Sequence, residues 1–84
     1  MITGYLYILK SLKDGKTYIG STDDLKRRLA QHEKGKVEST KNRLPMELIY
    51  QENYNLLAEA RYMERYYKSC AGRKKIREIL KEKM

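Results

Sequence analysis

The chain contains no tryptophan or phenylalanine, a single cysteine and no long hydrophobic run. One cysteine cannot form an internal disulfide, and a transmembrane helix needs about 20 consecutive apolar residues. No basic stretch leads into an apolar segment like that of a signal peptide. These absences argue against a disulfide-stapled scaffold and against a membrane span, so we expect a cytoplasmic protein.

The length and composition predict one small folded domain. A chain of 84 residues buries only about 60 to 65% of its extended surface, which is too little to divide between two cores. With 40% hydrophobic residues, the chain is too apolar to be wholly disordered. We therefore expect a single domain over residues 1–84, and we take it as a monomer.

The charge is strongly unbalanced, with 19 Lys and Arg against 11 Asp and Glu and a formal net charge of +8. Such an excess attracts polyphosphate backbones, so it predicts a nucleic acid or another polyanion as the partner. Net charge alone leaves one alternative open, namely that the charge only keeps the protein soluble.

The first quarter of the chain has the pattern of a β-hairpin. Residues 2–10 are mostly apolar or aromatic on both faces of an extended chain, which predicts a strand buried on both sides. Residues 13–16 are a turn signal, and Thr17 to Gly20 form a second β-prone run. We expect the two strands to pair in antiparallel orientation.

The next segment has the signals of a helix over about residues 23–34. Capping oxygens precede it, and Gly35 is placed to end it. Leu25, Leu29 and His32 recur at helical spacing on one face. This face should pack against the sheet.

The second half of the chain predicts one strand and two helices. A strand over residues 46–50 is entered through Pro45, where no ladder donor is needed. A second helix carries an apolar stripe at helical spacing, and a third begins after Gly72. The members of the stripe are Leu57, Ala60, Met63 and Tyr67. The fold class is thus α/β (α+β), a small, largely antiparallel three-stranded sheet with packed helices in the order β-β-α-β-α-α.

Two tyrosine motifs stand at a defined distance from later polar residues. Tyr5-Leu6-Tyr7 is followed after ten residues by Tyr18-Ile19-Gly20. Arg28 and His32 then lie one turn apart on the first predicted helix, so that both could address one phosphate. This order, with Glu64 on the second helix, resembles the small stand-alone members of the GIY-YIG nuclease superfamily. In the first motif Tyr5-Leu6-Tyr7 stands where Gly-Ile-Tyr is usual, so its terminal tyrosine carries the match.

The resemblance implies a metal-dependent endonuclease that hydrolyses DNA, with RNA as the other nucleic acid it could take. It implies the following roles: Tyr7 as general base, Tyr18 as its partner in the site, Arg28 on the phosphate, His32 as a relay for a proton or hydrogen bond, and Glu64 as the ligand of Mg²⁺ or Mn²⁺. Such hydrolysis needs a base for water and positive charge on the phosphoryl oxygens. A phenol with a pKa near ~10 can act as that base only where nearby positive charge favours its phenolate.

Each of these residues also has an ordinary structural interpretation. Tyrosines in strands are often packing residues, particularly in a chain without phenylalanine. His32 could be a packed core residue, and Glu64 could pair with Arg61 or Lys68 at helical spacing. Cys70 is expected to be a small buried residue or an idle thiol. The combined spacing, rather than any single residue, favours the nuclease.

A module that binds nucleic acid without cutting it is the second hypothesis. Basic residues would hold the phosphates in either case: Arg27, Arg28, Lys41, Arg43 and Arg73. Binding by such a module would depend on salt but not on Mg²⁺. A third hypothesis is a basic accessory protein of a ribonucleoprotein. The presence of all five site positions favours the enzyme, since a binding module has no use for the carboxylate of Glu64.

The register of the hairpin decides whether the two tyrosines can share a site. A two-residue turn at Asp14-Gly15 would place Tyr7 opposite Thr22 and leave it about 13 Å from Tyr18 along the strands. A four-residue loop over residues 11–14 would place Tyr7 directly opposite Tyr18. We predict the longer loop.

Overall fold

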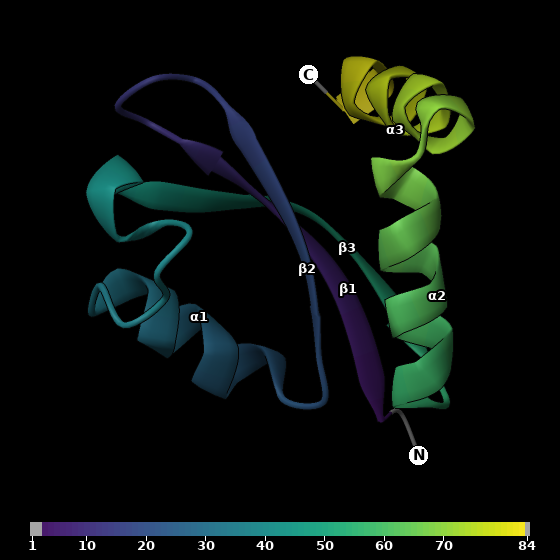
Figure 1. Cartoon of the computed structure of the whole chain (residues 1–84), viewed down its shortest axis with the longest axis horizontal. Helices are drawn as coiled ribbons and strands as arrows, with labels where there is room; N and C mark the ends of the chain where they lie inside the picture. Colours follow the sequence, from purple (N-terminus) through teal and green to yellow (C-terminus); the bar gives the residue numbers. More distant parts are fainter. Residues whose placement is uncertain (1–2, 84) are drawn as a thin grey trace.

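The computed structural model describes residues 3–83, and its elements follow the predicted order (Figure 1). They are β1 (Gly4–Ser11), β2 (Thr17–Thr22), α1 (Leu25–Glu33), η1 (Lys41–Arg43, a 3-10 turn), β3 (Met46–Tyr54), α2 (Leu57–Lys68) and α3 (Cys70–Lys83). The strands form one antiparallel sheet in the order β2-β1-β3, which confirms the predicted fold class. Within residues 3–83, every helix is too short or too polar to span a bilayer.

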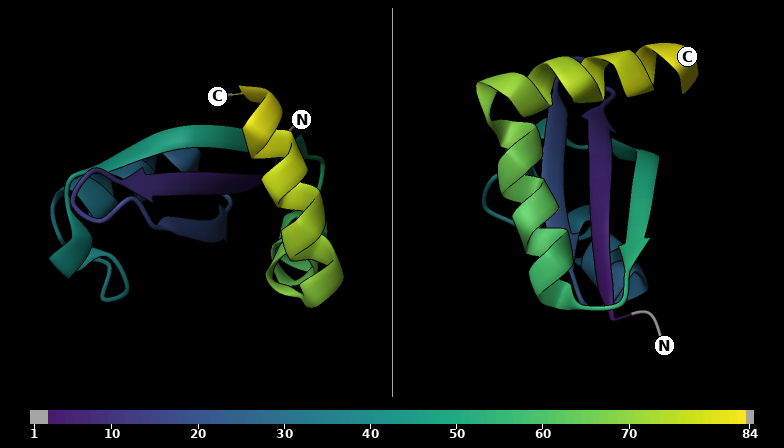
Figure 2. Two further views of the ribbon diagram at one scale, coloured as in Figure 1. Left: turned by 90° about the horizontal axis from the view of Figure 1, so that it is seen from above. Right: turned by 90° about the vertical axis from the view of Figure 1, so that its right-hand side faces the viewer.

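Strand β1 occupies the centre of the sheet because both of its faces are apolar or aromatic. Leu6, Tyr7 and Ile8 are fully buried. Leu6 and Ile8 point toward α2 and α3, where they pack with Tyr67 and Ile76. Tyr7 points to the opposite face, toward α1. The helices therefore cover both faces of a twisted sheet, with α2 alongside β2 and α3 crossing the end of α2 (Figure 2).

Helix α1 begins at Leu25, two residues after its predicted start, and it ends before Gly35 as predicted. The Asp24 carboxylate accepts a hydrogen bond from the Arg27 backbone N–H at 3.0 Å. Gly35 follows the helix with φ of 72°, a left-handed conformation that glycine adopts without steric cost. His32 is the buried residue of this helix.

The hairpin loop has the predicted four residues but lies one position later, over residues 12–15. The Ser11 backbone N–H donates to the Lys16 carbonyl at 2.8 Å and closes the loop. The Ser11 hydroxyl also accepts hydrogen bonds from the backbone N–H groups of Lys13 and Asp14. This short polar side chain stabilises the turn in a position that strand propensity did not reveal.

The shifted loop changes the register between β1 and β2. Tyr7 lies opposite Gly20, and Tyr18 lies opposite Leu9. The predicted direct pairing of Tyr7 with Tyr18 is therefore wrong, and the tight turn is also excluded. The two tyrosines are diagonal neighbours on one face, with ring centroids 6.3 Å apart. They can still share a site.

Helix α3 begins at Cys70, earlier than the predicted start after Gly72. The Ser69 hydroxyl accepts a hydrogen bond from the Gly72 backbone N–H at 3.2 Å and caps the helix. Gly72 is needed inside the first turn, because a Cβ there would lie 1.7 Å from the Tyr66 carbonyl oxygen. Cys70 is a free, exposed cysteine, so of its two expected roles the buried residue is wrong and the idle thiol stays a prediction.

Three tyrosine hydroxyls meet one carboxylate on the α2 face of the sheet. Tyr50, Tyr54 and Tyr67 each donate a hydrogen bond to Glu52. In a chain without phenylalanine, tyrosine fills the aromatic positions of the core, and each partly buried phenol needs a partner. The bond from Tyr67 ties β3 to α2, and β3 stays paired with β1 as far as Tyr54, beyond its predicted end at Tyr50.

Candidate active site

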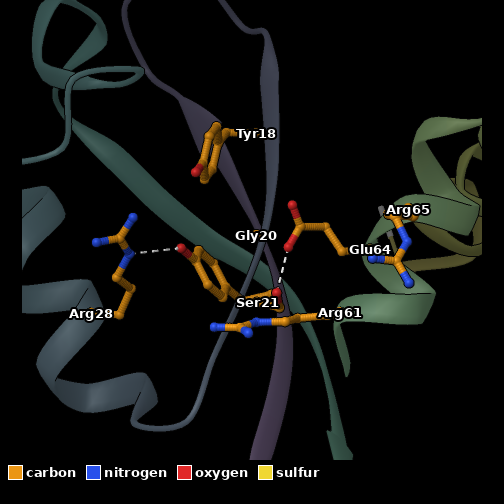
Figure 3. A pocket seen from close by; sticks show the side chains of 8 residues that line it. Tyr18, Gly20, Ser21, Arg28, Arg61, Glu64 and Arg65 are labelled. Carbon is orange, nitrogen blue, oxygen red and sulfur yellow. Dashed lines mark hydrogen bonds between the residues drawn. The ribbon is translucent and has the colours of Figure 1, made fainter. Parts of the chain in front are cut away.

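An open hollow of about 360 Å³ lies at the β2 edge of the sheet, between α1 and α2 (Figure 3). We call it the edge hollow. It is lined by Tyr7, Tyr18, Gly20, Ser21, Arg28, Arg61, Glu64 and Arg65. Of the predicted catalytic residues, all but His32 line it.

The edge hollow gathers side chains from both faces of the sheet. Successive residues of a strand point to opposite faces, so Gly20 faces α1 and Ser21 faces α2. The Ser21 hydroxyl donates a hydrogen bond to the Glu64 carboxylate of α2. Because β2 is the edge strand, groups from the two faces meet around it, and Glu64 reaches the same hollow as Arg28.

Gly20 gives the Tyr7 ring room to cross β2 and reach the edge hollow. A Cβ at this position would lie 2.5 Å from the Tyr7 hydroxyl oxygen and 2.6 Å from Cζ. Gly20 does not have a positive φ, so its backbone conformation is open to other residues. The glycine of the second tyrosine motif is therefore required by the packing of Tyr7.

We expect Gly20→Ala to lower the free energy of unfolding by about 1–3 kcal/mol, because the new methyl group overpacks the Tyr7 ring. Urea denaturation followed by circular dichroism measures the change. Thr17→Ala, at an exposed position of the same strand, should stay within about 0.5 kcal/mol of the wild type. Equal stability of the Gly20→Ala and Thr17→Ala proteins would contradict the close packing of Tyr7 on Gly20.

His32 is buried behind Tyr7 instead of lying beside Arg28 in the hollow. Its side chain is 1% exposed. His32 Nε2 lies 3.0 Å from the Tyr7 hydroxyl oxygen, and Nδ1 lies 2.8 Å from Thr40 Oγ1. The expectation that Arg28 and His32 address one phosphate together is therefore wrong. His32 is connected to the edge hollow by its hydrogen bond with the Tyr7 hydroxyl.

The donors around Tyr7 define the direction of this hydrogen-bonded chain. Arg28 Nε donates to the Tyr7 hydroxyl at 3.4 Å, which leaves the phenol to donate to His32 Nε2. The Nδ1–H of the imidazole then donates to Thr40. The chain thus runs from the edge hollow through two rings to a buried hydroxyl on the loop after α1.

Burial determines the protonation states of both rings. Burial raises the pKa of Tyr7 to about 12, although the hydrogen bond from Arg28 acts in the opposite direction. Burial, together with the charge of Arg28, lowers the pKa of His32 to about 4. Both groups are neutral at pH 7. The expectation that surrounding positive charge holds Tyr7 as a phenolate is not met in the free protein.

We expect the free energy of unfolding to fall as the pH drops from about 6.5 to 4. The unfolded chain protonates His32 below its ordinary pKa of 6.5, whereas the folded protein does so only near 4. The burial of a neutral imidazole therefore costs no stability above pH 6.5, and the free energy of unfolding falls progressively as the pH drops from 6.5 to 4. Urea unfolding at a series of pH values measures this slope, and His32→Gln should reduce it. Equal slopes in both proteins would contradict a buried neutral imidazole.

Arg28 presents a held guanidinium to the edge hollow from α1 (Figure 3). Its Nη1 donates to Gln31 Oε1 at 3.0 Å, and the hydrogen bond to Tyr7 raises its pKa further. Within residues 3–83, no carboxylate forms an ion pair with it. A planar cation held in place and open on one side is suited to two oxygens of a phosphate.

Glu64 faces the edge hollow from α2 with its side chain 24% exposed. One carboxylate oxygen accepts the hydrogen bond from Ser21, and the other lies 2.7 Å from Lys68 Nζ. The ordinary ion pair with Lys68 is therefore present, and the alternative pair with Arg61 is not formed. Lys68 is half-exposed, and an exposed ion pair of this kind contributes little, so another cation can replace Lys68 on Glu64.

A divalent ion would find one protein carboxylate in the edge hollow. Among residues 3–83, no group of three or more His, Cys, Asp or Glu side chains converges on a metal-sized site. Mg²⁺ usually keeps several waters and is held by one or two carboxylates together with substrate phosphates. Glu64, oriented by Ser21 and open to the hollow, fits this mode of binding.

The predicted phosphate-binding residues are dispersed in the structure. Arg28 lines the edge hollow, and Arg73 lies on α3. The other three form ion pairs with acidic neighbours: Arg27 with Asp23, Lys41 with Glu38, and Arg43 with Asp14. Of the predicted set, Arg28 is thus the residue that the fold brings to the tyrosines and Glu64.

Two arginines of the edge hollow were not among the predicted site residues. Arg61 and Arg65 lie one turn apart on α2, on either side of Glu64 in the sequence. Residues at positions i, i+3 and i+4 of a helix share a face. This spacing would have placed Arg61 and Arg65 beside Glu64 once Glu64 was assigned to the site.

Residues 3–77 match the family model of the GIY-YIG catalytic domain. The chain therefore belongs to the GIY-YIG family, a family of nuclease domains. It is similar along nearly its whole length to a UPF0213 protein of Streptococcus agalactiae, with 37% identity over 83 residues, which cover 98% of this chain and 93% of that protein. It is also similar to the UPF0213 protein YazA of Bacillus subtilis, with 39% identity over 72 residues, which cover 84% of this chain and 72% of that protein.

A solved structure has a similar fold. The solution NMR structure of the UPF0213 protein BH0048 from Bacillus halodurans is 32% identical in sequence and superimposes with a TM-score of 0.55. The likeness covers 94% of this chain and 85% of that protein. The arrangement of strands and helices described above is therefore shared with a relative of known structure.

Proposed function

We propose that this protein is a metal-dependent endonuclease that hydrolyses DNA phosphodiester bonds in the edge hollow. The observation that carries the proposal is the meeting of Tyr7, Arg28 and Glu64, from β1, α1 and α2, at one open hollow. A module that only binds nucleic acid gains nothing from a carboxylate beside its phosphate ligand, because like charges repel. Membership of a nuclease family supports the same conclusion.

In this proposal Tyr7 accepts a proton from the attacking water while it passes its own proton to His32. A phenol with a pKa of about 12 is protonated at pH 7, so it can act as a base only if its own proton leaves at the same time. His32 Nε2, at 3.0 Å, is the acceptor in place. Thr40 accepts the hydrogen bond from Nδ1–H and so keeps Nε2 free for this transfer.

The transfer leaves Tyr7 neutral and places a positive charge on His32. Burial and Arg28 oppose that charge in the free protein. An anionic phosphate in the edge hollow would offset it, because opposite charges nearby favour the protonated imidazole. The proton relay is therefore coupled to substrate, since the same phosphate that Arg28 binds makes His32 a better acceptor.

Arg28 binds the phosphoryl oxygens in this proposal, and Glu64 holds the divalent ion, either Mg²⁺ or Mn²⁺. The ion would supply positive charge for the phosphoryl and leaving oxygens. Tyr18 forms the wall beside the relay: its ring centroid lies 5.3 Å from that of His32, and Lys68 Nζ lies 5.9 Å from the centre of the Tyr18 ring. Tyr18 therefore positions the other two rings.

We expect Arg28→Lys to lower the cleavage rate by about 10²- to 10³-fold. Lysine keeps the charge but cannot offer two parallel N–H donors to a phosphate, nor can it hold Tyr7 and Gln31 in the same geometry. Single-turnover cleavage at saturating protein measures the effect. Near-normal cleavage by Arg28→Lys would remove the argument from the planar guanidinium.

A panel of branched, nicked, single-stranded and duplex DNA, each with a matched RNA, tests the proposal. The wild type is incubated with Mg²⁺, Mn²⁺ or EDTA, and binding is measured in parallel. We expect cleavage of at least one DNA with metal and none with EDTA. Salt-sensitive binding without cleavage under any of these conditions would instead favour the binding module.

A further inference from the structure

A second hollow of about 400 Å³ adjoins the edge hollow between α1 and α2. We call it the flanking hollow. The two hollows share Ser21, Arg28 and Arg61. Figure 3 shows the Arg61 side chain extending from α2 across the edge hollow in the direction of Arg28. Arg61 is therefore part of the wall between two adjacent spaces, each large enough for part of a ligand.

The flanking hollow is positively charged. Arg27, Arg28 and Arg61 all line it. Asp23 is the acidic residue in its lining, and its carboxylate lies 2.7 Å from Arg27 Nη2. Within residues 3–83, Arg61 has no carboxylate partner. Arg28 and Arg61 can therefore bind an anion without first breaking an ion pair.

Neutral groups in the flanking hollow suit the remaining parts of a nucleotide. Gln31 Oε1 accepts the hydrogen bond from Arg28, which leaves the amide N–H groups of Gln31 to donate to a ligand. Leu57 adds an apolar, partly buried surface of the kind on which a sugar ring can pack. A phosphate next to a deoxyribose matches this combination of cation, amide donor and apolar surface.

We propose that the flanking hollow binds the DNA phosphate next to the scissile phosphate, with Arg61 contacting both phosphates. This inference rests on the proposed function, since it takes the edge hollow as the place of cleavage. Consecutive phosphates of one strand present two anions one nucleotide apart, which fits two adjoining hollows that share Arg28 and Arg61. The strand would thus run through the groove between α1 and α2, crossing the edge of β2.

The test compares a thymidine dinucleotide, which has one phosphodiester, with a trinucleotide, which has two. Each is titrated into ¹⁵N-labelled protein in EDTA, so that no cleavage occurs, and amide shifts report affinity and location. For the wild type we expect the trinucleotide to bind about tenfold more tightly, the value of one added charge-assisted hydrogen bond. The amides of Thr22 and Gln31 should shift with the trinucleotide and much less with the dinucleotide.

Arg61→Ala should remove most of this gain, whereas Arg77→Ala should keep it. Arg77 is a matched control because it is an exposed arginine on α3 and outside both hollows. A gain that persists in Arg61→Ala, or that is absent from the wild type while the dinucleotide still shifts the edge hollow, would overturn the flanking site and leave the proposed function intact. If neither ligand shifts residues of the edge hollow, both proposals fail.

Discussion

Glu64→Gln is expected to lower metal-dependent DNA cleavage by about 10³-fold or more, equivalent to about 4 kcal/mol of transition-state stabilisation. Glutamine has the same shape, and its amide oxygen can still accept the hydrogen bond from Ser21. The change removes the negative charge and hence the ligand for the divalent ion and the ion pair with Lys68. Loss of a half-exposed ion pair should cost only about 0–1 kcal/mol of stability.

Two measurements separate a lost metal ligand from a damaged fold. Initial cleavage rates over a range of Mn²⁺ concentrations report activity, and paramagnetic broadening of the Ser21 amide signal by Mn²⁺ reports binding at the edge hollow. Glu78→Gln, an exposed glutamate on α3, is the matched control and should behave as the wild type. Normal cleavage by Glu64→Gln, or undiminished broadening at Ser21, would mean that the ion is held elsewhere.

Tyr7→Phe is expected to lower the cleavage rate by about 10²- to 10⁴-fold, the range for loss of a general base. Phenylalanine keeps the ring that packs over Gly20, but it removes the oxygen that contacts His32 and Arg28. A buried His32 Nε2 without a partner should also cost about 1–3 kcal/mol of folding free energy. The folded fraction must therefore be measured beside the cleavage rate.

The Tyr7→Phe experiment has a control on the outer face of α2. Tyr62 is 62% exposed and lies outside the edge hollow, so Tyr62→Phe should keep full activity and stability. Single-turnover rates with a DNA that the wild type cleaves, corrected for the folded fraction, measure the effect. A Tyr7→Phe protein that cleaves within a fewfold of the wild type would rule out the relay from Tyr7 to His32.

Periodicity and capping predicted the elements well because they are local properties. Leu6 and Ile8 alternate with Tyr7, so a strand with two buried faces is implied by the sequence. Gly35 marks the end of α1 through its backbone conformation, and the first residue of the helix, Leu25, lies within two residues of the predicted start. Such signals need no knowledge of the rest of the chain, which is why the element order and fold class were predictable.

The register of the hairpin loop was less predictable, because loops over residues 11–14 and 12–15 have the same length and are distinguished by local hydrogen bonds. The hydroxyl of Ser11 accepts two backbone hydrogen bonds and stabilises a loop one residue later than expected. A shift of this kind changes every cross-strand partner. It placed Gly20 rather than Tyr18 opposite Tyr7, and so made the glycine a packing requirement of the site.

The burial and protonation state of His32 depend on contacts with residues distant in the sequence. A histidine one turn after Arg28 could equally face solvent or the core, and helical spacing does not distinguish the two. The loop after α1 brings Thr40 against Nδ1, and β1 brings Tyr7 against Nε2. Burial, together with the charge of Arg28, lowers the pKa of His32 to about 4, and burial raises that of Tyr7 to about 12. The mechanism that we propose therefore uses a proton relay in place of a phenolate base.

By itself, the sequence determined which residues are available to the site: two tyrosines, Arg28 and Glu64 at defined spacings on predictable elements. The tertiary structure alone decided how they meet, because the edge of β2 brings together side chains from opposite faces of the sheet. It also placed Arg61 between two hollows. Lys41 and Arg43, in contrast, form ion pairs with acidic neighbours outside the edge hollow. Spacing along a chain is a local property, whereas burial and charge pairing depend on the neighbours that folding supplies.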